Sequence, residues 1–317
     1  MSPGKVLTGL MQVSWKKQDL LAYAVGVGAK ATDLPLVYDK AWAPLPTYPV
    51  VLGLKGNDDD VTLFTSKVRT SNVPGLPKLN PARVVHGSQA IEILKEIPAG
   101  SGKGWKLTGK LSGIHENKSG IIVERESVLI DPHGTAYAKL YSASFYLGAK
   151  GTGEKFSKVI SGPPQAKPVP KDRAADWVIK DQTTPEQAIM TLSSRLPPPT
   201  SYRLSGDYNP LHIDPKVGQA SGFPGVILHG LSTFGFAARG IISAVGGNDP
   251  RSLKFFGTRF TSPVLPGNAL ETHVWEVGKG PDGTIEVTFI TKNVATGKAC
   301  LGGGIAYIKK ADSKSKL

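Results

Sequence analysis

The feature that most constrains the fold of this chain is an order of segments that occurs twice. A helix-like apolar run is followed by several segments in which apolar and polar residues alternate. In the second half, LHGLSTFGFAARGIISAV (228–245) has the character of a buried helix. Four segments with strand-like alternation follow it between 253 and 310. In the first half, His86-Gly87 opens SQAIEILKEI, which we expect to be a helix, and three strand-like segments follow. One helix and then antiparallel strands, twice over, predicts an internal repeat.

A segment rich in glycine, proline and lysine separates the two copies. It runs from about 148 to 176 and lacks apolar periodicity, so we expect an extended linker. We therefore assign 1–150 to an N-terminal domain, 151–176 to the linker and 177–317 to a C-terminal domain. The fold predicted for each copy is α+β: a hot-dog, in which a curved antiparallel sheet wraps a central helix. Two such units can pair their sheet edges within one chain, giving a double hot-dog.

The net charge and the composition limit the classes of partner that this chain is expected to bind. The net charge is +13, which favours an anionic partner, either a nucleic acid or a phosphate-bearing group such as coenzyme A. Basic residues are scattered and no nucleic-acid-binding motif is found, so we expect no nucleic acid. No apolar run approaches about 18 residues, so we expect no membrane insertion. The single cysteine, Cys300, excludes a disulfide framework.

The segment YRLSGDYNPLHIDP, from Tyr202 to Pro215, carries the candidate chemistry. Asp207 and His212 stand five residues apart, separated by turn-forming residues that predict a tight loop. Such a loop can direct a carboxylate and an imidazole at one point, as is needed to move protons on and off a water molecule. The glycine of LHG, Gly230, then starts the helix-like run. Its N–H is a suitable donor to a developing oxyanion.

This loop followed by ILHGLSTFGFAARGI closely resembles the hydratase-2 motif of MaoC-like, (R)-specific 2-enoyl-CoA hydratases, also found in the hydratase part of peroxisomal multifunctional enzyme type 2. The resemblance implies hydration of trans-2-enoyl-CoA to (3R)-3-hydroxyacyl-CoA in fatty-acid β-oxidation by a lyase. Water would be activated between Asp207 and His212, with Asn209 orienting it and the Gly230 N–H on the thioester oxygen. No metal and no cofactor is expected, since coenzyme A is part of the substrate.

The resemblance also implies a set of substrate contacts and a division of labour. The first half lacks counterparts of Asp207 and His212 and carries a proline-rich apolar insertion, so it would house the acyl chain. Two contacts have plain structural alternatives: Lys118 as a solvated loop lysine and Phe260 as a core residue. His229 is interpreted as structural. Two chains are expected to form a homodimer. The implied substrate contacts are His86, Gly87, Lys118, Tyr208, Pro210, Leu211 and Phe260.

The last three residues, Ser315, Lys316 and Leu317, match a peroxisomal address. We therefore expect a matrix location reached through the import receptor. Two other functions stay open at this point: a hot-dog acyl-CoA thioesterase, and a non-catalytic acyl-CoA-binding protein. A thioesterase would aim water at the carbonyl carbon and release free coenzyme A. The Asp207–His212 pair argues against a protein that only binds.

Overall fold

A computed structural model describes residues 8–55, 75–80, 83–184 and 205–311. Part of the first-half insertion, the Tyr202–Leu204 start of the loop motif and the tripeptide Ser315–Leu317 lie outside the described residues.

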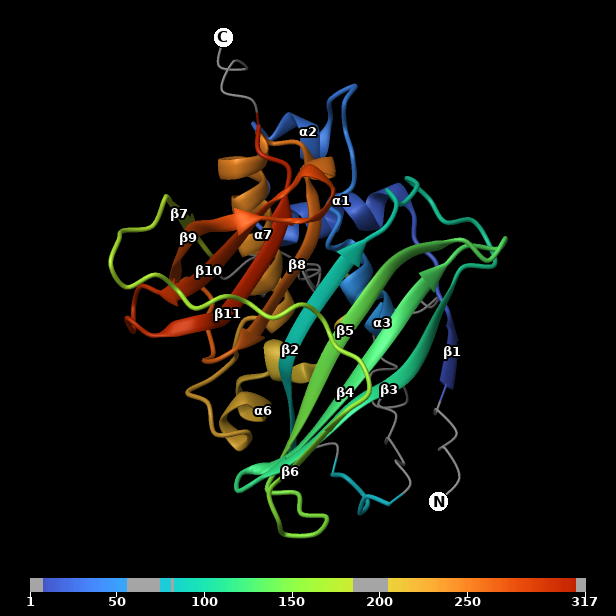
Figure 1. Ribbon diagram of the computed structural model, residues 1–317, viewed down its shortest axis with the longest axis vertical. Helices are drawn as coiled ribbons and strands as arrows, with labels where there is room; N and C mark the ends of the chain where they lie inside the picture. The colour runs from blue at the N-terminus through green and yellow to red at the C-terminus, as the bar shows by residue number, and fades with distance from the viewer. Residues whose placement is uncertain (1–7, 56–74, 81–82, 185–204, 312–317) are drawn as a thin grey trace, which may run out of the picture.

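The strands form one extended sheet of eleven members (Figure 1). Its order is β1-β3-β4-β5-β2-β8-β11-β10-β9-β7, with β6 beside β3. The strands of the first half are β1 (Thr8–Gln12), β2 (Val84–Ile93), β3 (Lys106–Asn117), β4 (Gly120–Ile130) and β5 (Ala136–Leu147). Those that follow are β6 (Phe156–Val159), β7 (Trp177–Gln182), β8 (Leu253–Phe260), β9 (Ala269–Lys279), β10 (Ile285–Asn293) and β11 (Ala299–Ile308).

The two halves meet edge to edge at β2 and β8. These strands pair antiparallel from Ser88↔Arg259 to Glu92↔Phe255. Every other strand pair in the sheet is also antiparallel. The pairing removes two exposed edges at once, because each edge strand satisfies the backbone groups of the other.

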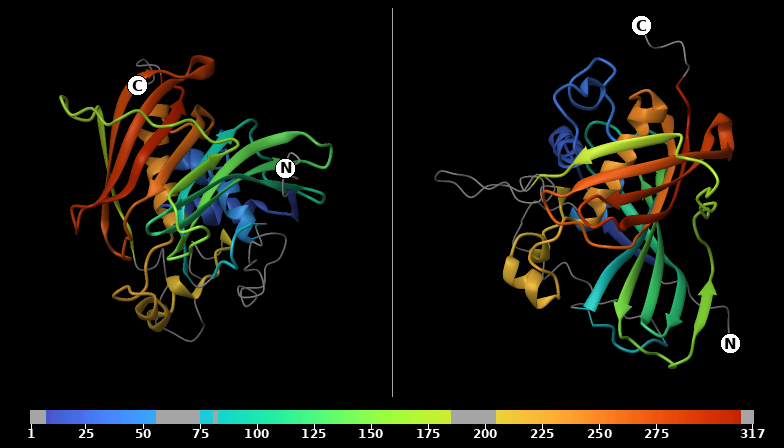
Figure 2. Two further views of the ribbon diagram at one scale, coloured as in Figure 1. Left: turned by 60° about the horizontal axis from the view of Figure 1, so that its bottom comes forward. Right: turned by 90° about the vertical axis from the view of Figure 1, so that its left-hand side faces the viewer.

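Helix α7 (Gly230–Gly246) is the central helix of the second half and lies against the inner face of the sheet (Figure 2). Nearly all of its residues are buried, including Phe234, Phe236, Ile241 and Ile242. It ends at Gly247, whose φ of 65° is the left-handed conformation that closes many helices. The predicted buried helix is therefore present where the apolar run places it.

The predicted first-half helix is wrong. The segment SQAIEILKEI belongs to strand β2, and the helix of the first half is instead α1 (Lys17–Gly26). β2 is hydrogen-bonded on both edges, to β5 and to β8, and Ile91 is fully buried on its inner face. Pairing with two long partners thus outweighs the local helical preference. In the described part of this half there are also the short helices α2 (Leu34–Val37), η1 (Tyr48–Val51) and α3 (Leu52–Lys55).

The end of α1 packs directly on α7. A Cβ at Gly235 would lie 2.3 Å from Val27 Cγ1, so glycine permits the close approach. Arg239 Nε donates to the Val27 carbonyl at 3.0 Å, and its guanidinium also pairs with Asp181 of β7. One hydrophobic cluster contains residues of both halves, so the two halves share a core and pack as a single body.

Residues between 151 and 176 cross the outer face of the sheet from one half to the other (Figure 1). β6 adds to β3, and the Ser161 hydroxyl donates to Glu126 at 2.8 Å. Further on, Lys167 Nζ lies 2.7 Å from Glu286 Oε2 on β10. Most of the segment lacks helix and strand, but it also supplies strand β6, which was not predicted from the sequence.

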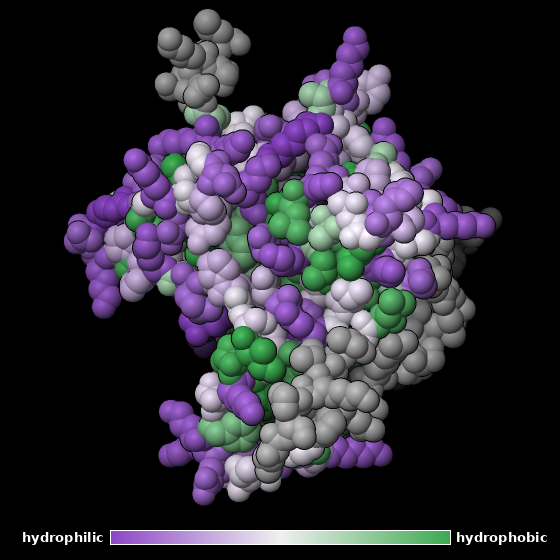
Figure 3. All heavy atoms as spheres, turned by 45° about the vertical axis from the view of Figure 1, so that its right-hand side comes forward, coloured by the Kyte–Doolittle hydropathy of each residue, from purple (hydrophilic) through white to green (hydrophobic). Residues whose placement is uncertain are grey.

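In the coloured part of the face drawn in Figure 3, hydrophilic side chains are interspersed with separate apolar patches. In the described part of the chain, no helix is long and apolar enough to cross a membrane.

Candidate active site

The loop before α6 (Pro215–Ala220) is held in one conformation by its own backbone and side chains. Gly206 has a φ of 110°, and a Cβ there would lie 2.4–2.8 Å from atoms of Lys55, so only glycine fits. The Asn209 N–H donates to Asp207 Oδ1 at 3.3 Å. Asn209 Oδ1 in turn accepts from the Leu211 N–H at 3.0 Å and caps η4 (Pro210–His212). The predicted tight loop is therefore present.

Asp207 and His212 lie together, as predicted, and His229 joins them. The His212 and His229 rings are stacked with centroids 3.7 Å apart. His229 Nε2 lies 4.0 Å from Asp207 Oδ2. One ligand atom from each of the three side chains falls within 4.8 Å of the others, so this trio is also the place where a metal ion could be held. The stacking of His229 on His212 was not predicted from the sequence, from which His229 is interpreted as structural.

Two hydrogen bonds to carbonyls orient the imidazoles. His212 Nδ1 lies 2.8 Å from the Ile227 oxygen, and His229 Nε2 lies 3.2 Å from the Asp207 backbone oxygen. A carbonyl only accepts, so the ring nitrogen facing it carries the proton. This leaves Nε2 of a neutral His212 with its lone pair, which is the form a general base requires.

Asp207 is an ionised carboxylate at this site. Burial alone would raise its pKa, but the neighbouring His229 and His212, the Asn209 N–H and the more distant His86 together lower the pKa below its ordinary value. Its side chain retains an exposed fraction of 15%, so it can still reach a ligand. A carboxylate beside two imidazoles can accept a proton, return it, or hold a water between itself and a ring.

The start of α7 lies beside this cluster. His229 is the N-cap residue, and its carbonyl accepts from the N–H groups of Ser232 at 3.0 Å and Thr233 at 3.2 Å. The N–H of Gly230 therefore belongs to the first turn, where helix geometry leaves donors for an anion. A Cβ at Gly230 would lie 3.2 Å from the Phe260 ring, so this glycine also makes room for the aromatic side chain.

The first half reaches the site through His86 at the start of β2. A register shift between His86 and Ser88 marks a bulge at Gly87, a device that redirects side chains near functional sites. The His86 ring lies 4.7 Å from that of Phe260. Desolvation lowers the pKa of His86 to about 4, although the residue is partly open to solvent at the start of β2 and the Asp207 charge opposes the shift. His86 is therefore a neutral imidazole at neutral pH.

Three of the remaining predicted substrate contacts lie in the loop that carries Asp207, and Lys118 lies in a different turn. Tyr208 is buried next to Asp207 in the loop, and Pro210 and Leu211 are half-buried in η4. Lys118 lies in the turn between β3 and β4, where its carbonyl accepts from Lys150 Nζ at 2.8 Å. In the described ranges, no hydrogen bond or ion pair joins Lys118 to the Asp207 cluster.

Comparison with known proteins follows the same two-part layout. Residues 13–148 match the MFE-2 hydratase 2 N-terminal domain, and residues 185–298 match the MaoC like domain. A probable dehydratase, NIT22, from Ajellomyces capsulatus is 32% identical over 95% of this chain and 80% of its own. The chain belongs to the MaoC-like hydratase 2 family. A probable enoyl-CoA hydratase 2 from Dictyostelium discoideum is 31% identical over 92% of this chain and 90% of its own.

Solved structures of other proteins agree with the fold. A MaoC-like dehydratase from Phytophthora capsici superposes with a TM-score of 0.81 at 32% identity, covering 98% of both chains. A Mycobacterium tuberculosis protein described as a double hotdog fold superposes with a TM-score of 0.54. The predictions of a double hot-dog and of a hydro-lyase are thus confirmed. Against the Drosophila melanogaster peroxisomal multifunctional enzyme type 2, 32% identical, the chain spans 47% of the relative's length.

Proposed function

We propose that this hydratase 2 family member adds water to trans-2-enoyl-CoA and forms (3R)-3-hydroxyacyl-CoA, with the water held between Asp207 and His212. The observation that supports it most is the ionised Asp207 carboxylate packed beside two imidazoles at the start of α7. Relatives named enoyl-CoA hydratase 2 support the choice of substrate.

The chemistry follows from the electronics of the substrate. The thioester carbonyl withdraws electrons through the double bond, so C3 is electrophilic. The water oxygen bonds to C3 while its proton passes to the Asp207–His212 pair, and C2 receives a proton from that pair. A hydroxyl and a hydrogen are thus added and nothing is released. Negative charge collects on the thioester oxygen, where the Gly230 N–H stabilises it by an amount on the order of 3 kcal/mol.

Neighbouring residues have supporting roles in this proposal. The Asn209 amide orients the water, since its oxygen is already engaged with the Leu211 N–H and its NH₂ group can act as a donor. His229 holds the His212 ring by stacking and the loop by its bond to the Asp207 carbonyl. The proposed substrate contacts are His86, Gly87, Tyr208, Pro210, Leu211 and Phe260, with Lys118 for a coenzyme A phosphate.

The test is turnover of trans-2-enoyl-CoAs of graded length with chiral analysis of the product. We expect loss of the absorbance of the conjugated thioester and a 3-hydroxyacyl-CoA of the R configuration. Release of free coenzyme A without that product would favour the thioesterase. An unchanged absorbance at saturating protein would favour a binding protein.

We also propose a role in peroxisomal fatty-acid β-oxidation, as a homodimer. The relatives from Drosophila melanogaster, Mus musculus and Arabidopsis thaliana are named peroxisomal, while others are not. Deleting Ser315, Lys316 and Leu317 should leave turnover unchanged and move the protein to the cytosol, as fluorescence microscopy would show. Import that continues in cells lacking any intact copy would contradict this address.

A further inference from the structure

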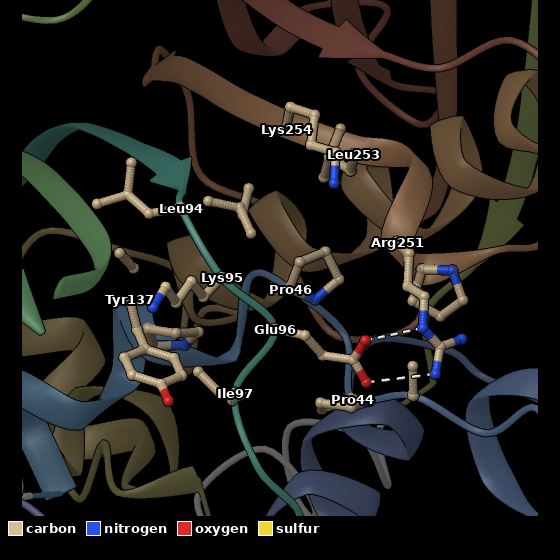
Figure 4. A pocket seen from close by; sticks show the side chains of 15 residues that line it. Pro44, Pro46, Leu94, Lys95, Glu96, Ile97, Tyr137, Arg251, Leu253 and Lys254 are labelled. Atoms are coloured by element: carbon tan, nitrogen blue, oxygen red, sulfur yellow. Dashed lines mark hydrogen bonds and ion pairs between the residues drawn. The ribbon is translucent and has the colours of Figure 1, made fainter. Parts of the chain in front are cut away.

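A pocket of about 170 Å³ lies between the two halves at the far end of α7 from the catalytic loop (Figure 4). It adjoins η5 (Pro250–Ser252), which follows that helix. The 17 residues of α7 rise about 1.5 Å each, so roughly 25 Å separate this pocket from Gly230. Its lining residues come from the first-half loop, the end of β2, the start of β5 and the start of β8.

The walls of the pocket are stiff. Four prolines, Pro44, Pro46, Pro49 and Pro250, line it, and a proline has its φ fixed by its ring. Tyr137 lines another side and packs edge-on against Trp105, with centroids 4.7 Å apart. A pocket whose walls are already in place loses little conformational freedom when a ligand enters.

An ion pair between the halves closes one side. Arg251 Nε and Nη2 lie 2.7 and 3.3 Å from the two carboxylate oxygens of Glu96, as Figure 4 shows. Arg251 Nη1 also donates to the Ala41 carbonyl at 3.1 Å. Because Arg251 engages both oxygens of Glu96, that carboxylate opposes an incoming anion far less than a solitary one would.

Two further cations line the pocket, one from each half. They are Lys95, just after β2, and Lys254 in β8. With Arg251 and Glu96, the lining carries three positive charges and one negative, a net charge of +2. The rest of the lining is apolar, apart from the tyrosine hydroxyl and backbone groups. An apolar interior with a cationic surplus is complementary to an anion that has an apolar body.

Volume sets the size of that body. An apolar cavity of about 150 Å³ accepts benzene. The pocket here is of similar volume and is bounded by the Tyr137 ring and proline rings, so it fits one flat six-membered ring.

We propose that this pocket binds a single-ring aromatic carboxylate, at a second site separate from the catalytic loop. The ring lies against Tyr137 and the prolines, and the carboxylate meets Lys95 and Lys254. Because the two lysines belong to different halves, the bound anion bridges the halves and stabilises their contact.

The experiment is a titration of the full chain with 4-fluorobenzoate, followed by fluorine NMR, with benzoate as competitor. We expect saturable binding in the millimolar range. Benzamide keeps the ring and lacks the charge, and acetate keeps the charge and lacks the ring, so each should compete at least about tenfold more weakly than benzoate. Equal competition by benzamide, or by acetate, would overturn the proposal.

Variants locate the site. Lys95→Met with Lys254→Met should weaken 4-fluorobenzoate binding at least about tenfold, as should Leu94→Trp, which fills the pocket from a partly exposed position. The matched control is Lys158→Met with Lys298→Met, which removes two exposed lysines that do not line the pocket and should leave binding unchanged. Unchanged affinity in both pocket variants would place the ligand elsewhere and refute the proposal. Competition between benzoate and an enoyl-CoA substrate would also refute a separate site.

Discussion

His-Gly preceded by an aliphatic residue occurs once in each half, as Val85-His86-Gly87 and Leu228-His229-Gly230, and the two copies are used differently. At 229–230 it begins helix α7, with His229 as the N-cap residue. At 86–87 it lies in strand β2, at a bulge opposite β5. Both histidines nevertheless end near Asp207, and Phe260 contacts the His86 ring while lying against Gly230. The two halves therefore share a plan but are not duplicates.

This difference shows that residues of both halves form the candidate site. The second half supplies the carboxylate, two imidazoles and the helix start, and the first half supplies one neutral imidazole. The α1–α7 contact and the shared hydrophobic cluster keep these parts in register. We therefore expect substitutions in the second half to remove chemistry and substitutions in the first half to change substrate fit.

The largest effect should come from Asp207→Asn. It removes the charge and proton affinity of the carboxylate while preserving its shape, so we expect kcat to fall at least about 100-fold. The matched control is Asp214→Asn in the same loop, whose carboxylate only caps α6 through the Lys216 N–H. Steady-state kinetics would check both, and similar losses in the two variants would show that the loop, rather than the carboxylate, matters.

The next largest effect on turnover should come from removing the Gly230 N–H. Gly230→Pro removes this donor at the first helical position, where proline is well tolerated. Gly230→Ala adds a comparable contact with Phe260 and keeps the N–H. We expect the proline variant to be about 100-fold slower than the alanine variant, the usual magnitude for one lost oxyanion donor. Equal rates for the two variants would remove Gly230 from the chemistry.

A smaller, graded effect should come from the first-half insertion, which we propose holds the acyl chain. Val51 is fully buried in the core, so a charge there would unfold the protein, whereas Leu54 is only half-buried. Leu54→Asp should lower kcat/KM for long substrates and spare short ones, since each buried methylene contributes about 0.8 kcal/mol. Leu54→Ala is the control for lost volume. A loss that is uniform across chain lengths would make this half a purely structural partner.

The smallest effect should be on the pH dependence of stability. His86 has its pKa lowered from 6.5 to about 4 in the folded protein, so the unfolded chain binds more protons between these values. The free energy of unfolding should therefore fall as the pH drops from 6.5 towards 4. His86→Gln should flatten that fall relative to the wild type, because glutamine does not titrate in this range. Urea unfolding across this range measures both; identical slopes in wild type and His86→Gln would contradict the assignment.

Several features of the fold follow from local sequence, and others do not. The helix at 230–246 and the strands from β8 to β11 follow from apolar spacing and alternation, because these residues bury one continuous face. The segment SQAIEILKEI was wrongly predicted to be a helix, because a short apolar run fits the period of a helix as well as that of a strand. Its pairing partners β5 and β8, which decide between the two, are distant in the sequence. β6 was missed for the same reason: only its pairing with β3 defines it.

The candidate site also has parts that follow from local sequence and parts that do not. The grouping of Asp207, Asn209 and His212 could be predicted because one short loop carries all three. His229 could not, since its stacking on His212 depends on how α7 approaches the loop. Its position directly before Gly230, the proposed oxyanion donor, was the available signal.

The most direct test of the central claim is a double-mutant cycle on kcat with Asp207→Asn and His212→Ala. If both side chains act on one water molecule, each single variant loses at least about 100-fold and the double variant loses little more than either. Losses that multiply in the double variant would show that the two residues act independently. Near-wild-type turnover in either single variant would contradict the account outright.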